Sequence, residues 1–205
     1  MRFWNHYRMA KLIYRQMAEN SIQVNEAFFI LGNLGPDLYF SYIYRHHTRA
    51  GSGAHLERQI NCLYAAGAEE NAAKFSYHLG VMSHYICDFL CYPHTPAFRG
   101  GTRVHIQHEK RQTVSADMLP FNSQKIKGLD IAELKKTLDR KISYREQLMA
   151  RNTRDDFDDY SEIPIAMYVA TWAVAGAWFH AAQRATHICV GTHWGNTLGS
   201  DPTPL

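Results

Sequence analysis

Histidines placed at regular distances from carboxylates are the residues of this sequence best suited to chemistry. The chain holds 12 histidines among 205 residues, roughly two to three times the share expected of an average soluble protein. Imidazole is the commonest metal ligand in proteins. The histidine content therefore directs attention to metal binding.

Two His-x3-carboxylate pairs follow one another along the chain. His84 and Asp88 are four residues apart, and so are His105 and Glu109. On a helix each pair lies on one face and can share a metal ion, and the two oxygens of Asp88 can bridge two cations. One such pair alone is more typical of a surface ion pair. Two pairs on consecutive helices, with His94 between them, predict a metal centre.

Three further candidate ligands lie where loops are expected to meet helices. They are His6, Asp37 and His55. Glycine or proline precedes the last two, which lets the backbone approach a shared centre closely. His46 or His47 lies nearer to Asp37 and could take the place of His55, but we favour His55.

Helical periodicity dominates the sequence, and no run alternates convincingly enough for a sheet. We therefore predict an all-α fold, a single-domain helical bundle over residues 1–190 followed by a flexible tail over residues 191–205. The composition, 46% hydrophobic and 20% charged, supplies enough apolar material for one packed core.

The predicted helices must bring the candidate ligands together. We expect them over residues 6–19, 24–31, 55–66, 69–91, 102–118, 130–151 and 161–190. Asn5 and Asp130 are the expected caps of the first and sixth helices. The glycine- and proline-containing segment from Gly32 to Asp37 predicts a turn after the second helix, and Pro93 ends the fourth.

In order and type, these candidate ligands resemble those of the zinc-dependent phospholipase C family, whose all-helical fold is shared with the P1/S1-type nucleases. The resemblance covers roughly Asn5 to Asp117. Its sharpest parts are the six-residue step from Asp88 to His94 and the His-x3-Glu pair that follows. The nucleases close with His-x3-Asp after a longer gap, so Glu109 favours the phospholipase branch.

The resemblance implies two or three zinc ions per chain. One ion would be held by Asp37, His55, His84 and Asp88, a second by His94, His105 and Glu109, and a third by His6 with the bridging Asp88. The ions would stabilise the charge of a phosphodiester and activate the water that attacks phosphorus. Asp37 is the first candidate for the base that orients this water, and Glu109 is the second.

Two departures from the family pattern bear on these expectations. Secreted members complete the third zinc site with a mature N-terminal Trp, whereas this sequence begins with Met1 and its Trp4 is internal. The third ion could therefore be replaced or absent. The sequence also shows no signal peptide and no C-terminal lipid-binding sandwich, so we expect a cytoplasmic protein.

The remaining expectations concern partners and function. The uncharged stretch Ile163–Gln183 is long enough to span a bilayer, but its many alanines predict a buried core helix and no transmembrane segment. A net charge of +3 is too small to predict a specific nucleic-acid partner. We predict a zinc-dependent hydrolase of a phospholipid or another small phosphodiester. A P1/S1-like nuclease or nucleotidase, and a metal-binding scaffold that has lost turnover, are the alternatives.

Overall fold

All regular elements in the described part of the chain are helices, which confirms the predicted all-α fold. The computed structural model describes residues 3–38, 47–66, 72–112, 130–151 and 162–193. The elements are α1 (Phe3–Glu19), α2 (Glu26–Leu38), α4 (Arg49–Ala66), α5 (Ala72–Phe89), the 3-10 helix η1 (Tyr92–His94), α6 (Thr102–Arg111), α7 (Ile131–Arg151) and α8 (Glu162–His193).

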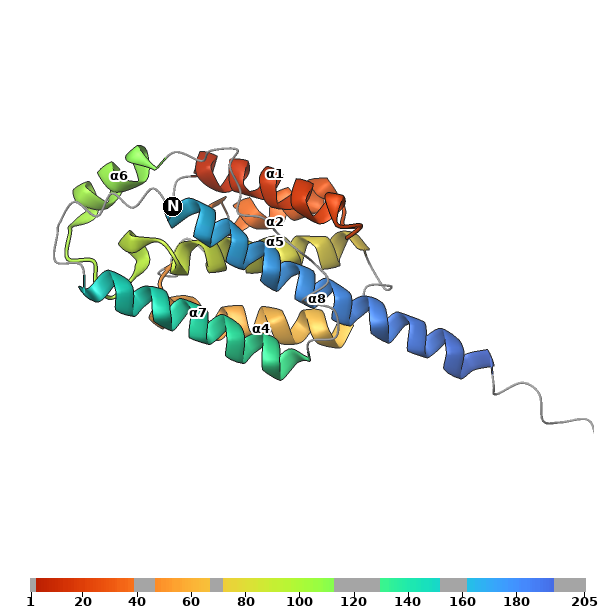
Figure 1. Cartoon of the computed structure of the whole chain (residues 1–205). Helices are drawn as coiled ribbons and strands as arrows, with labels where there is room; N and C mark the ends of the chain where they lie inside the picture. Colours follow the sequence, from red (N-terminus) through yellow and green to blue (C-terminus); the bar gives the residue numbers. More distant parts are fainter. Residues whose placement is uncertain (1–2, 39–46, 67–71, 113–129, 152–161, 194–205) are drawn as a thin grey trace, which may run out of the picture.

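Helix α5 is the centre of the bundle. It packs against α2, α8 and α4, with α1 and α2 on one side and α4 and α7 on the other (Figure 1). Every residue of α5 from Leu79 to Phe89 is buried. Polar side chains on this stretch must therefore find partners inside the protein, because an unpaired buried polar group is costly.

Glycines bring α2 and α5 into backbone contact where the two helices cross. A Cβ atom on Gly32 would lie 2.0 Å from the carbonyl oxygen of Tyr77, and one on Gly80 would lie 2.1 Å from the carbonyl oxygen of Phe29. No other residue fits at either position without moving a helix. The crossing places the second half of α5 directly beneath α2.

The turn predicted after the second helix is wrong, because α2 continues to Leu38 with Pro36 inside it. Pro36 lacks the N–H that would bond to the carbonyl of Gly32, and its ring crowds that carbonyl, but only two residues of the helix follow it, so little of the helix is disturbed. The glycines of this segment serve the crossing with α5 instead of a turn.

Two other helices begin earlier than predicted. Helix α1 begins at Phe3, so Asn5 lies inside it and is not its cap. Helix α4 begins at Arg49, and the hydroxyl of Thr48 accepts a hydrogen bond from the Gly51 N–H at 3.2 Å, as an N-cap does. Residues 49–53, which we expected to precede this helix, are therefore part of it.

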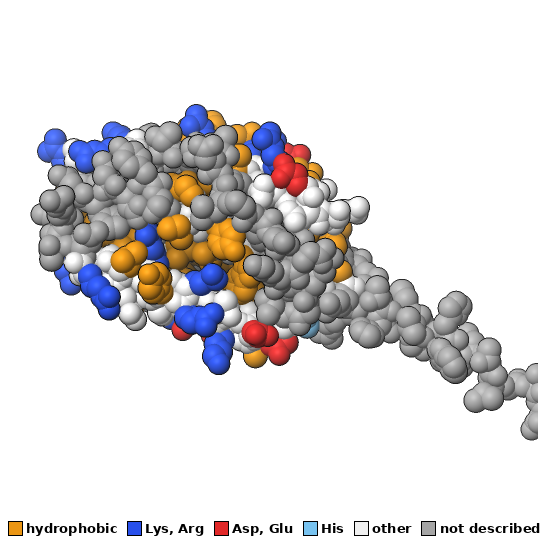
Figure 2. Space-filling model, viewed as in Figure 1, with side chains coloured by type: hydrophobic (Ala, Val, Ile, Leu, Met, Phe, Trp, Pro, Cys, Tyr) orange, Lys and Arg blue, Asp and Glu red, His pale blue; other side chains and the backbone are white. Residues whose placement is uncertain are grey.

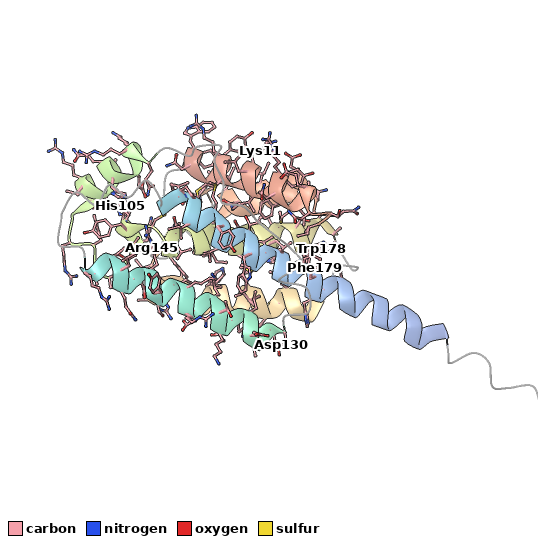
Figure 3. The ribbon with its side chains drawn as sticks, viewed as in Figure 1. Lys11, His105, Asp130, Arg145, Trp178 and Phe179 are labelled. Carbon is pink, nitrogen blue, oxygen red and sulfur yellow. The ribbon has the colours of Figure 1, made fainter. Side chains whose placement is uncertain are left out.

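Asp130 caps α7 as predicted. Its carboxylate accepts a hydrogen bond from the Glu133 N–H at 2.7 Å, and Figure 3 shows it at the beginning of this helix.

On the face shown in Figure 2, hydrophobic side chains gather over the middle of the molecule. Lys141 of α7 contacts two aromatic rings of α8. Its Nζ lies 5.8 Å from the centre of the Tyr168 ring and 5.9 Å from that of the Trp172 ring, as in cation–π pairs.

Helix α8 contains one segment, Ile163–Ala182, that is long and apolar enough to cross a membrane, and 61% of it is buried inside the protein. It packs along α5 and also contacts α1, α4 and α7. Trp178, labelled in Figure 3, donates from its indole nitrogen to the carbonyl of Gln23 at 2.8 Å. These contacts are those of a core helix.

Candidate metal centre

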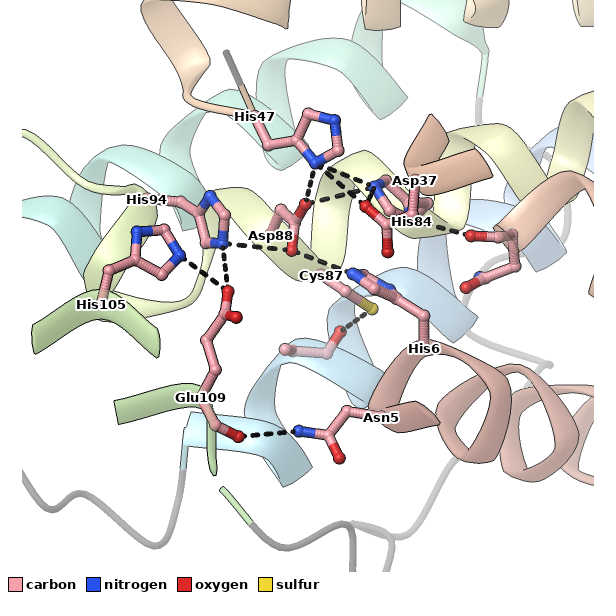
Figure 4. Close-up of polar contacts among 12 residues, drawn as sticks. Asn5, His6, Asp37, His47, His84, Cys87, Asp88, His94, His105 and Glu109 are labelled. Atoms are coloured by element: carbon pink, nitrogen blue, oxygen red, sulfur yellow. Dashed lines mark hydrogen bonds and ion pairs between the residues drawn. The ribbon is translucent and has the colours of Figure 1, made fainter. Parts of the chain in front are cut away.

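Six segments of the chain converge on one cluster of histidines and carboxylates. Helix α5 supplies two side chains from its last two turns, and α6 supplies two at the same i, i+4 spacing. One side chain each comes from α1, α2 and η1. The last comes from His47, two positions before α4. The cluster, drawn in Figure 4, consists of His6, Asp37, His47, His84, Asp88, His94, His105 and Glu109.

Asp88 is the centre of this cluster, and its two oxygens face different histidines. Oδ2 lies 2.9 Å from Nδ1 of His47 and 3.2 Å from Nε2 of His84. Oδ1 lies 3.1 Å from Nε2 of His6 and 3.6 Å from Nε2 of His94. Asp88 is fully buried. A buried carboxylate with imidazoles on both oxygens is arranged as a bridge between two cations.

Glu109 forms a second group with two histidines. Its Oε1 lies 2.7 Å from Nε2 of His105 and 3.5 Å from Nε2 of His94. The ligand atoms of these three residues all lie within 4.8 Å of one another. Because His94 also faces Asp88, the two groups are neighbours.

Asp37 lies near His47 and His84, two of the histidines that face Asp88. Its Oδ1 is 3.6 Å from Nδ1 of His47 and 3.9 Å from Nε2 of His84. Its other oxygen, Oδ2, is buried and has no hydrogen-bond partner among the described residues, and the same is true of Nδ1 of His6. Buried polar atoms are nearly always paired, so the unpaired oxygen of Asp37 indicates that the cluster binds a further group.

Two contacts outside the cluster hold its members in place, and sequence reasoning missed both. His84 donates from Nδ1 to the carbonyl of Asn33 at 2.8 Å, which turns its Nε2 toward the carboxylates; such a contact fixes the tautomer of a metal ligand. Asn5 donates from Nδ2 to the carbonyls of Glu109 and Gln112, both at 3.4 Å. Since α6 has no fully buried residue, Asn5 helps to hold it against α1.

Burial keeps most of the imidazoles neutral. Burial and the charge of His6 lower the pKa of His84 to about 4, and burial also lowers the pKa values of His6 and His94. Burial would likewise lower the pKa of His47, but its hydrogen bond to Asp88 and the charges of Asp88 and Asp37 together outweigh burial and raise it. A neutral imidazole has a free lone pair for a metal ion.

The three carboxylates have different acidities. Burial would raise the pKa of Asp88, but the positive charges around it, with that of His94 the largest contribution, together outweigh burial and hold this pKa well below its ordinary value. The pKa of Glu109 is also lowered, because hydrogen bonds from His105 and His94 outweigh its burial. By contrast, burial, with a contribution from the charge of Asp88, raises the pKa of Asp37.

The structure does not bring His55 into the cluster, and His47 lies where we expected His55. His55 lies almost two turns inside α4, where its Nε2 accepts a hydrogen bond from Nε2 of Gln59 at 3.3 Å. The physical reason is the early beginning of α4 at Arg49, which carries residue 55 along the helix. His46, the other alternative, lies outside the described residues.

The cluster fits zinc. Its members offer five imidazoles and three carboxylates, which are the nitrogen and oxygen ligands that zinc takes in proteins. Three sets of three ligand atoms each lie within 4.8 Å: His6, Asp37 and His84; His47, His84 and Asp88; His94, His105 and Glu109. The buried, unpaired oxygen of Asp37 is a place where such an ion would complete the bonding.

Comparison with known families decides what kind of protein carries this cluster. Residues 5–181 match the family described as zinc dependent phospholipase C. The chain belongs to this zinc-dependent phospholipase C family. No curated protein and no solved structure matches the chain.

Membership of the zinc-dependent phospholipase C family agrees with both the fold and the cluster. The match includes all eight clustered residues, and the family's dependence on zinc agrees with their donor atoms. The family is one of phospholipid hydrolases, so the chain is a phospholipase C-like hydrolase at the level of the family.

Proposed function

We propose that this protein is a phosphodiesterase that hydrolyses a phospholipid, or another small phosphodiester, by the phospholipase C reaction. The observation that carries this proposal is the bridging position of Asp88, with His47 and His84 on one oxygen and His6 and His94 on the other. Such a bridge holds cations side by side, as hydrolysis of a charged phosphodiester requires.

The cluster offers ligands for two or three zinc ions. We propose that Asp37, His47, His84 and Asp88 hold one ion, that His94, His105 and Glu109 hold a second, and that His6 with Asp88 contributes to a third. Bound zinc would supply positive charge against the phosphate and lower the pKa of a water molecule to about 7.

Asp37 is the residue best placed to orient the attacking water and take its proton. Its Oδ2 is buried and unpaired among the described residues, and burial raises its pKa, which makes its carboxylate a better base. Glu109 is the weaker candidate, because its contacts with His105 and His94 lower its pKa. The acidities therefore support the order expected from the sequence.

The substitution Asp37→Asn tests this assignment. It keeps the size of the side chain but removes the base, and removal of a general base lowers the rate about 10²- to 10⁴-fold. Hydrolysis of p-nitrophenylphosphocholine and of phosphatidylcholine should fall by this factor, while the melting temperature stays unchanged. Glu19→Gln, an exposed change on α1, is the control. Full activity of Asp37→Asn would rule out the proposed role, and cleavage of single-stranded DNA in preference to both esters would rule out the proposed substrate.

A further inference from the structure

A cavity of about 460 Å³ lies between α4 and α7, and none of the proposed metal ligands lines it. Its inner wall consists of apolar side chains that are at most 5% exposed: Leu56, Ile60, Phe89, Leu138 and Ile142. The cavity is open to solvent, and the apolar side chains of its wall favour contact with an apolar guest. This cavity is therefore suited to a hydrocarbon ligand.

Charged side chains surround the mouth of the cavity. Lys135 of α7 donates to Glu57 of α4 at 3.2 Å, and Arg49 of α4 forms an ion pair with Asp139 of α7. Both pairs join the two helices across the mouth. Arg49 also pairs with Glu146 of α7 at 3.0 Å, whereas Lys136, also at the rim, is exposed and can face a ligand. An anionic group at the mouth would find complementary charge.

The cavity shares a wall with the metal centre. Phe89, which lines the cavity, follows Asp88 directly in α5. The ring of Tyr85 lies 6.0 Å from that of Phe89 and 5.6 Å from that of His47. Arg49 at the rim is two residues from His47. One layer of aromatic side chains therefore separates the cavity from the ligands that we assign to zinc.

We propose that this cavity binds an acyl chain of the phospholipid substrate, an inference that rests on the proposed function. The lining residues extend from Arg49 to Ile60 on α4 and from Lys135 to Ile142 on α7, about 16 Å and about 10 Å along the two helix axes. This elongated form fits a hydrocarbon chain of medium length.

Gly53 allows the cavity to be filled without altering the core. It lines the cavity, and a Cβ atom added there would meet only Cγ of Arg49, at an ordinary 3.7 Å. The variant Gly53→Leu therefore places a new apolar side chain where the acyl chain would lie. Ala54→Leu is the matched control, because Ala54 is the next residue of the same helix, is exposed and does not line the cavity.

The test compares kcat/KM for dihexanoylphosphatidylcholine with that for p-nitrophenylphosphocholine, which has no acyl chain. Gly53→Leu should lower the first value about tenfold, as expected when about two methylene groups lose their burial. The second value and all values for Ala54→Leu should stay unchanged. An equal effect of Gly53→Leu on both substrates, or no effect on either, would overturn the proposal.

A binding measurement separates failure of this inference from failure of the proposed function. Octanesulfonate carries an alkyl chain and an anion but no phosphoester, and calorimetry should show that it binds the unaltered chain at least about tenfold more tightly than Gly53→Leu. Equal affinity, or no binding to either, overturns the acyl-chain site whatever the activity. Absence of hydrolysis of both esters by the unaltered chain contradicts the proposed function instead.

Discussion

At the scale of single residues, the position of His47 defines the site. Its Nδ1 lies 2.9 Å from Asp88 and 3.6 Å from Asp37, whereas His55 bonds to Gln59. We infer that His47, and not His55, completes the first zinc site. The two histidines belong to the same part of the chain, which makes each the natural control for the other.

The variants His47→Ala and His55→Ala should therefore differ in metal content. Loss of one of four ligands weakens a zinc site strongly, so His47→Ala should lose about one zinc ion per chain after dialysis, and His55→Ala should keep the full number. Elemental analysis of the dialysed proteins measures this. The opposite result, with zinc lost only from His55→Ala, would show that His55 is the ligand, as expected from the sequence.

Residue types and spacing were enough to predict most of the cluster, because i, i+4 pairs on a helix have fixed geometry. His84 with Asp88 and His105 with Glu109 are of this kind. The choice between His47 and His55 depended instead on where α4 begins. Thr48 could have indicated that beginning as an N-cap, but we expected the helix to begin only at residue 55, after the glycines.

At the scale of elements, the crossing of α2 and α5 positions the site. Gly80 lies one turn before His84, and Gly32 lies next to Asn33, whose carbonyl accepts the hydrogen bond of His84. The close approach at the two glycines thus sets the distance over which this hydrogen bond forms. Sequence patterns could not reveal the crossing, since it depends on which helices meet in space.

The variant Gly80→Ala should separate the two helices. Its Cβ would lie 2.1 Å from the carbonyl oxygen of Phe29, and overpacking of this kind costs about 1–3 kcal/mol of unfolding free energy. Zinc affinity, measured by competition with a chelator, should fall as well, because His84 moves away from Asn33. For comparison, Gly53→Ala meets no obstacle and should be neutral or stabilising by up to about 1 kcal/mol. Equal stabilities of the two variants in urea denaturation would refute the role of the crossing.

At the scale of the whole molecule, the buried histidines make the metal-free protein sensitive to acid. The pKa of His84 is about 4 in the folded protein against an ordinary value of 6.5. Between these two pH values the unfolded chain binds a proton that the folded chain does not, so stability falls as the pH falls. His6 and His94 act in the same direction and His47 in the opposite one.

Urea denaturation of the chelator-treated protein should therefore give a lower unfolding free energy at pH 5.0 than at pH 7.5. The shift of His84 alone corresponds to about 3 kcal/mol when fully developed near pH 4. Added zinc should stabilise the protein at pH 7.5 by binding only the folded state. Equal or greater stability of the metal-free protein at pH 5.0 would show that these imidazoles are not held neutral by burial.

The most direct test of the account is the metal content of the purified protein. Protein prepared without added metal and without a histidine tag should contain about two or three zinc ions per chain by plasma mass spectrometry. The double variant His84→Ala, Asp88→Ala removes the bridge and should lose most of this zinc. Absence of metal from the unaltered chain, or an unchanged content in the double variant, would contradict a zinc centre built around Asp88.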